Sequence, residues 1–197
     1  MAHLREDRRH IKDRDLYLLK ELVKVKLNLE MSVQEEIVAI ACKVKPHQAT
    51  LVPEKRQELT TEGGLDVLSG FKKIKEVVRR LKRQGIAASL FIDPDIRQIA
   101  AAKETGVNMI ELHTGSYSLA RNQKEQDGYF RELERAARYG KSKNLQVFAG
   151  HGLNYCNVAR VCRIKEIEEL NIGHSIISRA VFVGLEQAIR EMKALIT

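Results

Sequence analysis

The stretch LQVFAGHG, residues 145–152, contains the pattern that decides the fold class. Residues 145–150 form a short apolar run of the kind that predicts a strand buried on both faces. A histidine and a glycine follow directly, so the end of this predicted strand offers an imidazole for proton transfer and a backbone that a ligand can approach closely. The rest of the chain repeats this arrangement of a buried strand that ends in polar residues.

Similar apolar runs predict further strands at 25–30, 47–53, 86–92, 108–114 and 169–174, with a possible stub ending at His3. Segments of helical period separate the runs. Gly85, Gly106 and Asn144 stand just before a strand, where the end of a helix needs a residue that tolerates positive φ. One helix is predicted at the end of the chain, and its apolar face is formed by Ile177, Val181, Leu185, Ala188, Met192 and Ile196.

Strict alternation of strands and helices predicts an α/β fold with a parallel sheet, either open and doubly wound or closed into a (β/α)8 TIM barrel. Polar strand ends favour the barrel, since barrels collect site residues from many strands on one face, whereas an open sheet concentrates them at one switch point. The polar residues at these ends are Glu30, Glu54, Lys55, Asp93, Glu111, His113, His151 and His174. Because the runs fall short of eight, we expect residues 1–197 to form a single partial barrel, truncated at its N-terminus by the first strand and helix and most of the second strand.

The composition bounds the class of protein and its partners. The chain has 197 residues, of which 44% are hydrophobic, no apolar run long enough for a membrane span and no signal-peptide pattern, which predicts a cytoplasmic protein. A net charge of +8 suits phosphorylated metabolites, nucleic acid or an anionic surface. Aromatic residues make up only 5% and no nucleic-acid motif is recognisable, so we expect neither nucleic acid nor membrane as a partner. Cys42, Cys156 and Cys162 lack metal-site spacing and are expected to be reduced packing residues.

Glycines after the last two predicted strands indicate a phosphate site. Loops after the last two strands of a barrel commonly hold phosphate with backbone N–H groups and a helix N-terminus. We therefore interpret Gly152, Gly173 and His174 as phosphate contacts and His151 as a catalytic group. The alternative is that these glycines only make tight turns and that the histidine is structural.

Glu30 ends an otherwise apolar strand, where an unpaired carboxylate would be costly to bury. This position predicts a general base with a raised pKa, and the alternative is a carboxylate paired with a nearby arginine. Glu111 and His113 alternate along one strand and so face the same side of the sheet. We expect them to support the barrel mouth without a catalytic step of their own.

Two polar segments have competing interpretations. HLREDRRH, residues 3–10, is either a solvated charge run or part of an anion site. Residues 52–67 are too long for a minimal βα connection and are interpreted as a mobile loop over the site. Thr60 and Thr61 can donate hydroxyls to an anion there, or cap the helix that follows.

Seven blocks, in this order and spacing, resemble the pyridoxine 5′-phosphate synthase family of one bacterial vitamin B6 pathway: HLREDRRHI, NLEM, LVPEKRQELTTEGGLDV, SLFID, IELHTG, AGHGLNY and ELNIGH. The resemblance runs through essentially the whole chain. It implies a (β/α)8 barrel that assembles as a homo-octamer and uses no metal or organic cofactor. It also implies a ring-closing transferase that condenses 1-deoxy-D-xylulose 5-phosphate with 3-amino-2-oxopropyl phosphate, giving pyridoxine 5′-phosphate, phosphate and water.

The resemblance further implies roles for single residues. His3 and Glu30 would be proton acceptors, and His151 would be a proton donor. The residues implied for the phosphate of the deoxyxylulose substrate are Arg5, His10 and Thr60, and those for the aminoketone phosphate are Gly152, Gly173 and His174. The rest of the opening charge run, residues 6–9, would be a solvated remainder.

Two other functions stay open. Another phosphate-binding barrel enzyme, an isomerase or aldolase, would share the glycine-bounded site, but most such aldolases need a strand-end lysine for a Schiff base, and Lys55 is the only one nearby. A catalytically inactive barrel subunit would keep the fold and one phosphate site. A truncated barrel exposes two strand edges, so we expect weak activity or none unless a neighbouring subunit covers them.

Overall fold

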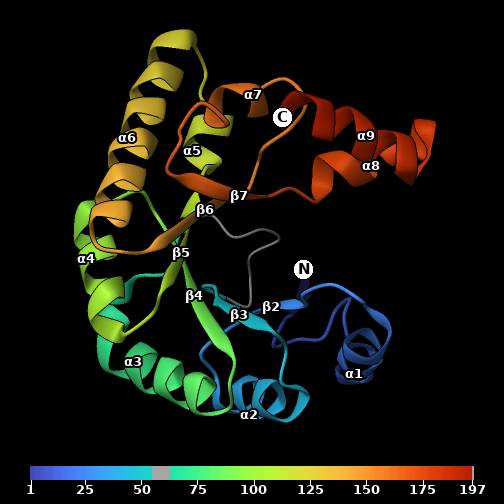
Figure 1. Cartoon of the computed structure of the whole chain (residues 1–197), viewed down its shortest axis with the longest axis vertical. Helices are drawn as coiled ribbons and strands as arrows, with labels where there is room; N and C mark the ends of the chain where they lie inside the picture. Colours follow the sequence, from blue (N-terminus) through green and yellow to red (C-terminus); the bar gives the residue numbers. More distant parts are fainter. Residues whose placement is uncertain (55–62, 197) are drawn as a thin grey trace.

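A computed structural model describes residues 1–54 and 63–196 of the chain (Figure 1). Its sheet contains seven strands, all paired in parallel and ordered as they follow one another in the sequence. The strands are β1 (Ala2–Leu4), β2 (Asn28–Met31), β3 (Gln48–Leu51), β4 (Ala87–Ile92), β5 (Met109–His113), β6 (Gln146–Gly150) and β7 (Ile167–Asn171). This curled, sequentially ordered parallel sheet confirms the predicted α/β barrel class.

Helices cover the convex side of the curled sheet (Figure 1). They are α1 (Asp13–Leu22), α2 (Glu35–Val44), α3 (Val67–Arg83), α4 (Ile96–Thr105), α5 (Gly115–Ser118), α6 (Gln123–Ser142), α7 (Val158–Val161), α8 (His174–Val183) and α9 (Leu185–Ile196). The side chains of Asp66, Asp95 and Asn122 accept backbone hydrogen bonds at the starts of α3, α4 and α6. Among the described helices, none combines the length and the hydrophobicity that crossing a membrane would require.

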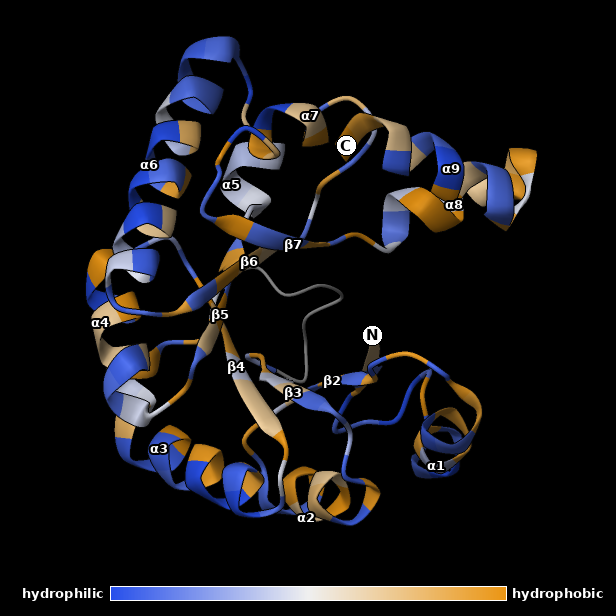
Figure 2. Ribbon diagram, viewed as in Figure 1, coloured by the Kyte–Doolittle hydropathy of each residue, from blue (hydrophilic) through white to orange (hydrophobic). Residues whose placement is uncertain are grey.

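The two faces of the sheet differ in polarity because successive strand residues point to opposite sides. Leu29, Leu90 and Ile110 face the helices and belong to the main hydrophobic core. Glu30 and Glu111 lie on the opposite, concave face, together with buried Thr50 and Ser89. In Figure 2 the long helices α3 and α6 carry apolar stripes between hydrophilic ones, as helices that cover a sheet on one side should.

The predicted element boundaries hold to within a few residues except near the end of the chain. β7 begins two residues before the predicted start and ends at Asn171, so residues 172–174 lie beyond it. The prediction of one final helix is wrong, because the backbone of Gly184 leaves helical geometry with φ +81° and separates α8 from α9. The two helices pack against each other. Ala188 and Met192 of the predicted apolar face are buried, whereas Ile177 and Val181 are exposed. Positive φ at the three predicted helix ends is confirmed for Gly85, Gly106 and Asn144.

The three cysteines are free thiols. Cys42 and Cys162 are half-buried, in line with the predicted packing role. That role is wrong for Cys156, which is exposed. Its backbone N–H is held by the Asn154 side chain in the turn after β6, and this turn leaves the thiol in solvent.

The sheet is open between its two edge strands, β1 and β7, neither of which has a second neighbour in the described part of the chain. Figure 1 shows α8 and α9 projecting on one side of this opening and α1 lying on the other. Large apolar side chains exposed on and beside these helices are Tyr17, Leu18, Leu22, Val25, Ile177, Val181, Phe182 and Leu185. The region around the opening therefore presents apolar surface that the inner strands do not.

Candidate active site

The candidate active site lies at the carboxyl ends of the strands, on the concave side of the sheet. Parallel pairing brings these ends to one rim, so His3, Glu30 and Thr50 occupy matching positions on the neighbouring strands β1, β2 and β3. Glu111 lies in β5, and His151 is the first residue after β6. Acids and imidazoles that are distant in the sequence thus share one face of the sheet.

His3 joins two carboxylates near the N-terminal edge. Its Nε2 atom hydrogen-bonds to Oε1 of Glu54 at 3.0 Å, and its Nδ1 atom lies 3.8 Å from Oε2 of Glu30. Burial raises the pKa of Glu30, and the charge of His3 opposes that rise only in part. A raised pKa agrees with the predicted general base, and its ionic partner is a histidine rather than the arginine of the alternative interpretation.

Glu54 is a site residue that the sequence analysis placed at a strand end without giving it a role. Burial alone would raise its pKa, but hydrogen bonds from His3 and from the backbone N–H of Glu6 outweigh burial and lower it. An ionised Glu54 accepts from His3 Nε2 and so leaves Nδ1 of the imidazole facing Glu30.

Glu111 is the most strongly perturbed acid on the concave face. Its side chain is buried, and burial together with repulsion from Glu30 raises its pKa to about 8, although Asn171 Nδ2 donates to its Oε2 at 2.7 Å. At neutral pH the carboxyl group is therefore mostly protonated and can donate a proton. Gly150 makes room for it, since a Cβ there would lie 2.2 Å from Oε1 of Glu111.

The supporting role predicted for Glu111 understates this chemistry. Glu111, like Glu30, is a carboxylate within an otherwise apolar strand, and this pattern could have indicated a raised pKa for both residues. The rise in its pKa comes from burial and from repulsion by Glu30, which lies far away in the chain and is brought close only by folding, while the hydrogen bond from Asn171 opposes the rise.

His151 occupies a strained backbone position directly after β6. Its φ of +79° lies in the left-handed region, which costs a non-glycine residue about 1–3 kcal/mol and persists only where the surroundings hold it. Burial, and secondarily the charge of His113, lower the pKa of the His151 imidazole. The ring is therefore mostly neutral near pH 7, and it must take up a proton before it can act as a donor.

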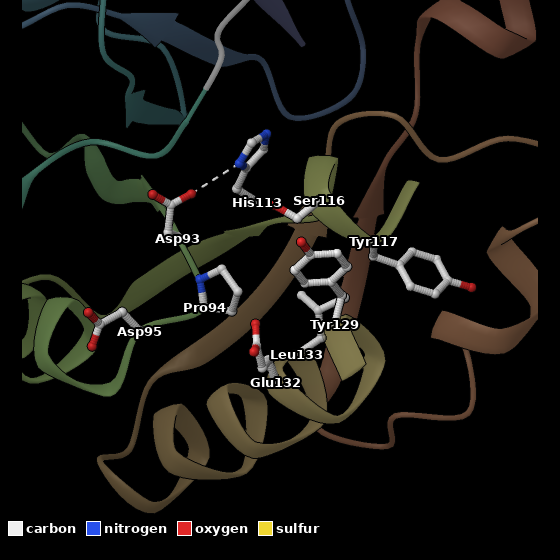
Figure 3. Close-up of a pocket in the computed structure, with 9 residues that line it drawn as sticks. All are labelled: Asp93, Pro94, Asp95, His113, Ser116, Tyr117, Tyr129, Glu132 and Leu133. Atoms are coloured by element: carbon white, nitrogen blue, oxygen red, sulfur yellow. Dashed lines mark hydrogen bonds and ion pairs between the residues drawn. The ribbon is translucent and has the colours of Figure 1, made fainter. Parts of the chain in front are cut away.

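Asp93, His113 and His151 form a row across the ends of β4, β5 and β6. Asp93 Oδ1 and His113 Nδ1 are 3.0 Å apart, as the dashed line in Figure 3 marks. The ring of His113 meets that of His151 edge-on with centroids 4.9 Å apart, and Phe91 packs on both rings. Asp93 thus fixes the orientation of His113, which in turn borders His151.

Gly152, Gly173 and His174 lie at the two strand ends where the sequence predicts phosphate. Gly152 has φ +80°, and a Cβ there would collide with the Ser118 side chain. Gly173 precedes α8, whose first turn has no side-chain cap and so leaves N–H groups free for an anion. A Cβ at Gly173 would meet nothing within 4 Å, so steric crowding does not require that glycine.

Arg5 and His10 differ in their surroundings. Arg5 is buried at 7% exposure, and its Nε and Nη2 atoms each donate to Asp7 at 3.2 Å. His10 is exposed in the segment between β1 and α1. The interpretation of residues 6–9 as a solvated remainder fits Asp7 and Arg9, which are exposed. Asp7 also pairs with Arg5, and Arg8 bridges to acids on α1 and α2. Thr60, Thr61 and Lys55 lie outside the described residues.

A separate cavity of about 200 Å³ lies on the helix side of Asp93 and His113 (Figure 3). Its other lining residues are Pro94, Asp95, Ser116, Tyr117, Tyr129, Glu132 and Leu133. Of the predicted catalytic and phosphate-binding residues that the structure describes, none lines this cavity. Within residues 1–54 and 63–196, no group of three or more histidine, cysteine or acidic side chains is placed to hold a metal ion.

The curled parallel sheet with acids and imidazoles at the carboxyl ends of its strands places the chain in the class of TIM-barrel-like α/β proteins. The chain belongs to the family described as Pyridoxal phosphate biosynthesis protein PdxJ, which matches residues 1–197. This match confirms the resemblance seen in the sequence blocks.

Three relatives carry the name pyridoxine 5′-phosphate synthase. The relative from Trichlorobacter lovleyi is 55% identical over 194 residues, covering 98% of this chain and 81% of the relative. The relative from Geobacter sulfurreducens is 54% identical, with 99% and 82% covered, and the one from Synechococcus sp. is 56% identical, with 98% and 80% covered. About a fifth of each relative therefore has no counterpart in this chain.

Solved structures of other families share the fold. A 4-hydroxy-2-oxoglutarate aldolase/2-deydro-3-deoxyphosphogluconate aldolase from TTHB1 matches with a TM-score of 0.63 and 12% identity, covering 100% of this chain and 81% of the other. The Amycolatopsis orientalis BexX/CysO complex matches with a TM-score of 0.51 and 11% identity, covering 98% and 90%. At such low identity the likeness concerns the fold alone.

Proposed function

We propose that this chain is a pyridoxine 5′-phosphate synthase that condenses 1-deoxy-D-xylulose 5-phosphate with 3-amino-2-oxopropyl phosphate. The names of relatives at 54–56% identity support the reaction. The observation that carries the proposal is the set of proton-transfer groups on one concave face, in which Glu30 and Glu111 both have raised pKa values and His3 lies beside Glu30.

The proposed reaction consists mainly of proton transfers. An amine adds to a ketone, water leaves the carbinolamine, a C–H proton is removed so that phosphate can be eliminated, and an aldol-type closure completes the ring. We assign proton removal to Glu30 and His3. His151 donates protons, and Glu111, whose pKa of about 8 keeps it protonated, is a second donor.

Two phosphate sites anchor the reactants in this proposal. The backbone at Gly173 and the exposed His174 at the start of α8 take the aminoketone phosphate together with Gly152. Arg5 and His10 take the phosphate of the deoxyxylulose substrate, with Thr60 as the third ligand implied by the resemblance. Anchoring both reactants in one pocket makes the ring closure effectively intramolecular.

The direct test mixes purified protein with both substrates and follows pyridoxine 5′-phosphate by its fluorescence. We expect Glu30→Gln and His151→Asn each to lower kcat by about 10²–10⁴-fold, the usual contribution of a general acid or base. Glu76→Gln is the control, because this exposed glutamate pairs with Arg79 on the surface of α3, away from the site. Parent turnover in both site variants would contradict the site assignment, and no product from the parent would contradict the function.

The open sheet edge favours a second candidate, an inactive barrel subunit that keeps one phosphate site. Calorimetric titration separates the two candidates, because a synthase binds both phosphorylated substrates and the inactive subunit binds at most one. An aldolase acting through a Schiff base is disfavoured, since none of the seven described strands contains a lysine.

We also propose that the chain works as a homo-oligomer, with the octamer implied by the family resemblance as the specific expectation. Exposed apolar residues on α1 and α8, among them Leu22, Val181 and Phe182, support self-association. Light scattering after size-exclusion chromatography measures the mass, and a monomer at assay concentration would contradict the proposal.

A further inference from the structure

We propose that Thr114 is a positioning residue for His151, whose backbone it holds in the left-handed conformation. Thr114 directly follows β5, while His151 directly follows the neighbouring strand β6. This inference rests on the proposed function insofar as His151 acts as a proton donor there.

The contacts of Thr114 reach both peptide units at the end of β6. Its backbone N–H donates to the carbonyl oxygen of Gly150 at 2.9 Å. Its hydroxyl lies 2.8 Å from the same oxygen and 2.6 Å from the carbonyl oxygen of His151. Since one hydroxyl proton is shared between two carbonyls, the side chain links the end of β6 to the residue that leaves it.

The hydroxyl of Thr114 does not cap the helix that Thr114 precedes, although a threonine at a helix N-cap commonly does so. Thr114 is the N-terminal capping residue of α5, yet its side chain makes no capping hydrogen bond to that helix. The residue is fully buried, so its hydroxyl needs a partner, and it finds that partner on the neighbouring strand end. The Thr114 hydroxyl therefore binds the backbone at the end of β6 and not the first turn of α5.

His151 needs such support because two successive residues there have positive φ, +79° at His151 and +80° at Gly152. Glycine adopts this conformation freely, whereas histidine does not. Return of His151 to negative φ would swing its Cβ and move the imidazole away from the ring of His113, now 4.9 Å away. Holding the carbonyl of His151 opposes that rotation.

The test compares Thr114→Val, which keeps the branched shape but removes the hydroxyl, with Thr114→Ser, which keeps the hydroxyl. We expect Thr114→Val to lower kcat by about 10- to 100-fold, as displacement of a catalytic group by about 1 Å does, while KM for both substrates stays unchanged. Thr114→Ser restores most of the turnover. Parent kcat in Thr114→Val would overturn the inference.

A double-mutant cycle with His151→Asn distinguishes positioning from general structural support. If Thr114 acts through His151, then Thr114→Val causes no further loss of kcat in the His151→Asn background. An equal loss in both backgrounds would overturn the inference.

The crystal structure of Thr114→Val gives a readout that does not depend on turnover. We expect the His151 ring to move by more than about 0.5 Å, the tolerance of a catalytic group, and a ring at its parent position would overturn the inference. A displaced ring in a protein whose parent form makes no pyridoxine 5′-phosphate would instead contradict the proposed function and leave the positioning role standing.

Discussion

Site residues on the inner strands are more buried and have more neighbours than site residues on the edge strands. On the inner side, His113 is buried between Asp93, Phe91 and His151 at the ends of three adjacent strands. At the edges, His3 lies on a three-residue strand with one neighbour, and Gly173 leads into α8, a helix with no buried residue. The proposed reaction needs both regions, so the weaker one limits how precisely the substrates and catalytic groups meet.

A core substitution on an inner strand should produce the largest loss of stability. Leu90→Ala removes a fully buried side chain from β4, and we expect the free energy of unfolding to fall by about 2–5 kcal/mol. Val181→Ala on α8, where the side chain is 79% exposed, should change it by less than about 0.5 kcal/mol. Urea denaturation measures both, and equal effects would remove the distinction between the two regions.

Glu111 should make the stability of the inner strands depend on pH. Its pKa is about 8 in the folded protein, whereas the ordinary pKa of a glutamate is 4.5, so the folded state binds the proton more tightly than the unfolded state. The stabilisation is complete below pH 4.5 and is lost as pH rises toward 8, at about 1 kcal/mol per pH unit.

Glu111→Gln should flatten this dependence, because the amide keeps the shape of the side chain and does not titrate. Denaturation midpoints between pH 5 and 9 provide the comparison, with Glu76→Gln as the control for removal of a surface charge. Parallel pH curves for the parent and Glu111→Gln would contradict the raised pKa.

Gly150→Ala tests how closely the carboxyl of Glu111 fits against β6. The new Cβ would lie 2.2 Å from Oε1 of Glu111, so we expect a loss of about 1–3 kcal/mol in stability together with lower turnover. Gly128→Ala is the matched control, because nothing lies within 4 Å of a Cβ there and the helix α6 should gain slightly. Equal behaviour of the two variants would show that Gly150 does not limit the site.

The smallest effect is expected within the α8–α9 pair. Arg179 donates to Glu191 at 2.7 Å, but both side chains are partly exposed, and Arg179→Ala should cost less than about 1 kcal/mol. Thermal unfolding at low and high salt would reveal the difference, which should shrink as salt rises. A larger loss would mean that the edge region is held more firmly than its burial indicates.

The sequence predicts the parts of the fold that depend on local pattern. Runs such as LQVFAG carry apolar residues through a strand, and the glycine or asparagine before three of these runs adopts the positive φ that ends the preceding helix. The break at Gly184 was missed because apolar residues continue at helical spacing through it, and only the packing of α9 back on α8 shows that the period is interrupted. Periodicity alone does not report where a helix turns back.

The site was predictable where a residue type is unusual for its position. Glu30 and His151 stand out as polar groups at the ends of apolar strands. The protonation of Glu111 arises from burial and from repulsion by Glu30, and the Thr114 hydroxyl binds the carbonyl oxygen of His151; the fold brings these groups together from different strands. Such contacts leave no trace in the local pattern of residues.

The strand order has a consequence for how the chain reaches this structure. In the part of the chain that the structure describes, each strand pairs with the strands directly before and after it in the sequence. During synthesis the sheet can therefore grow by one strand and helix at a time from β1, and the concave face that carries Glu30 is laid down before the ribosome has made β6.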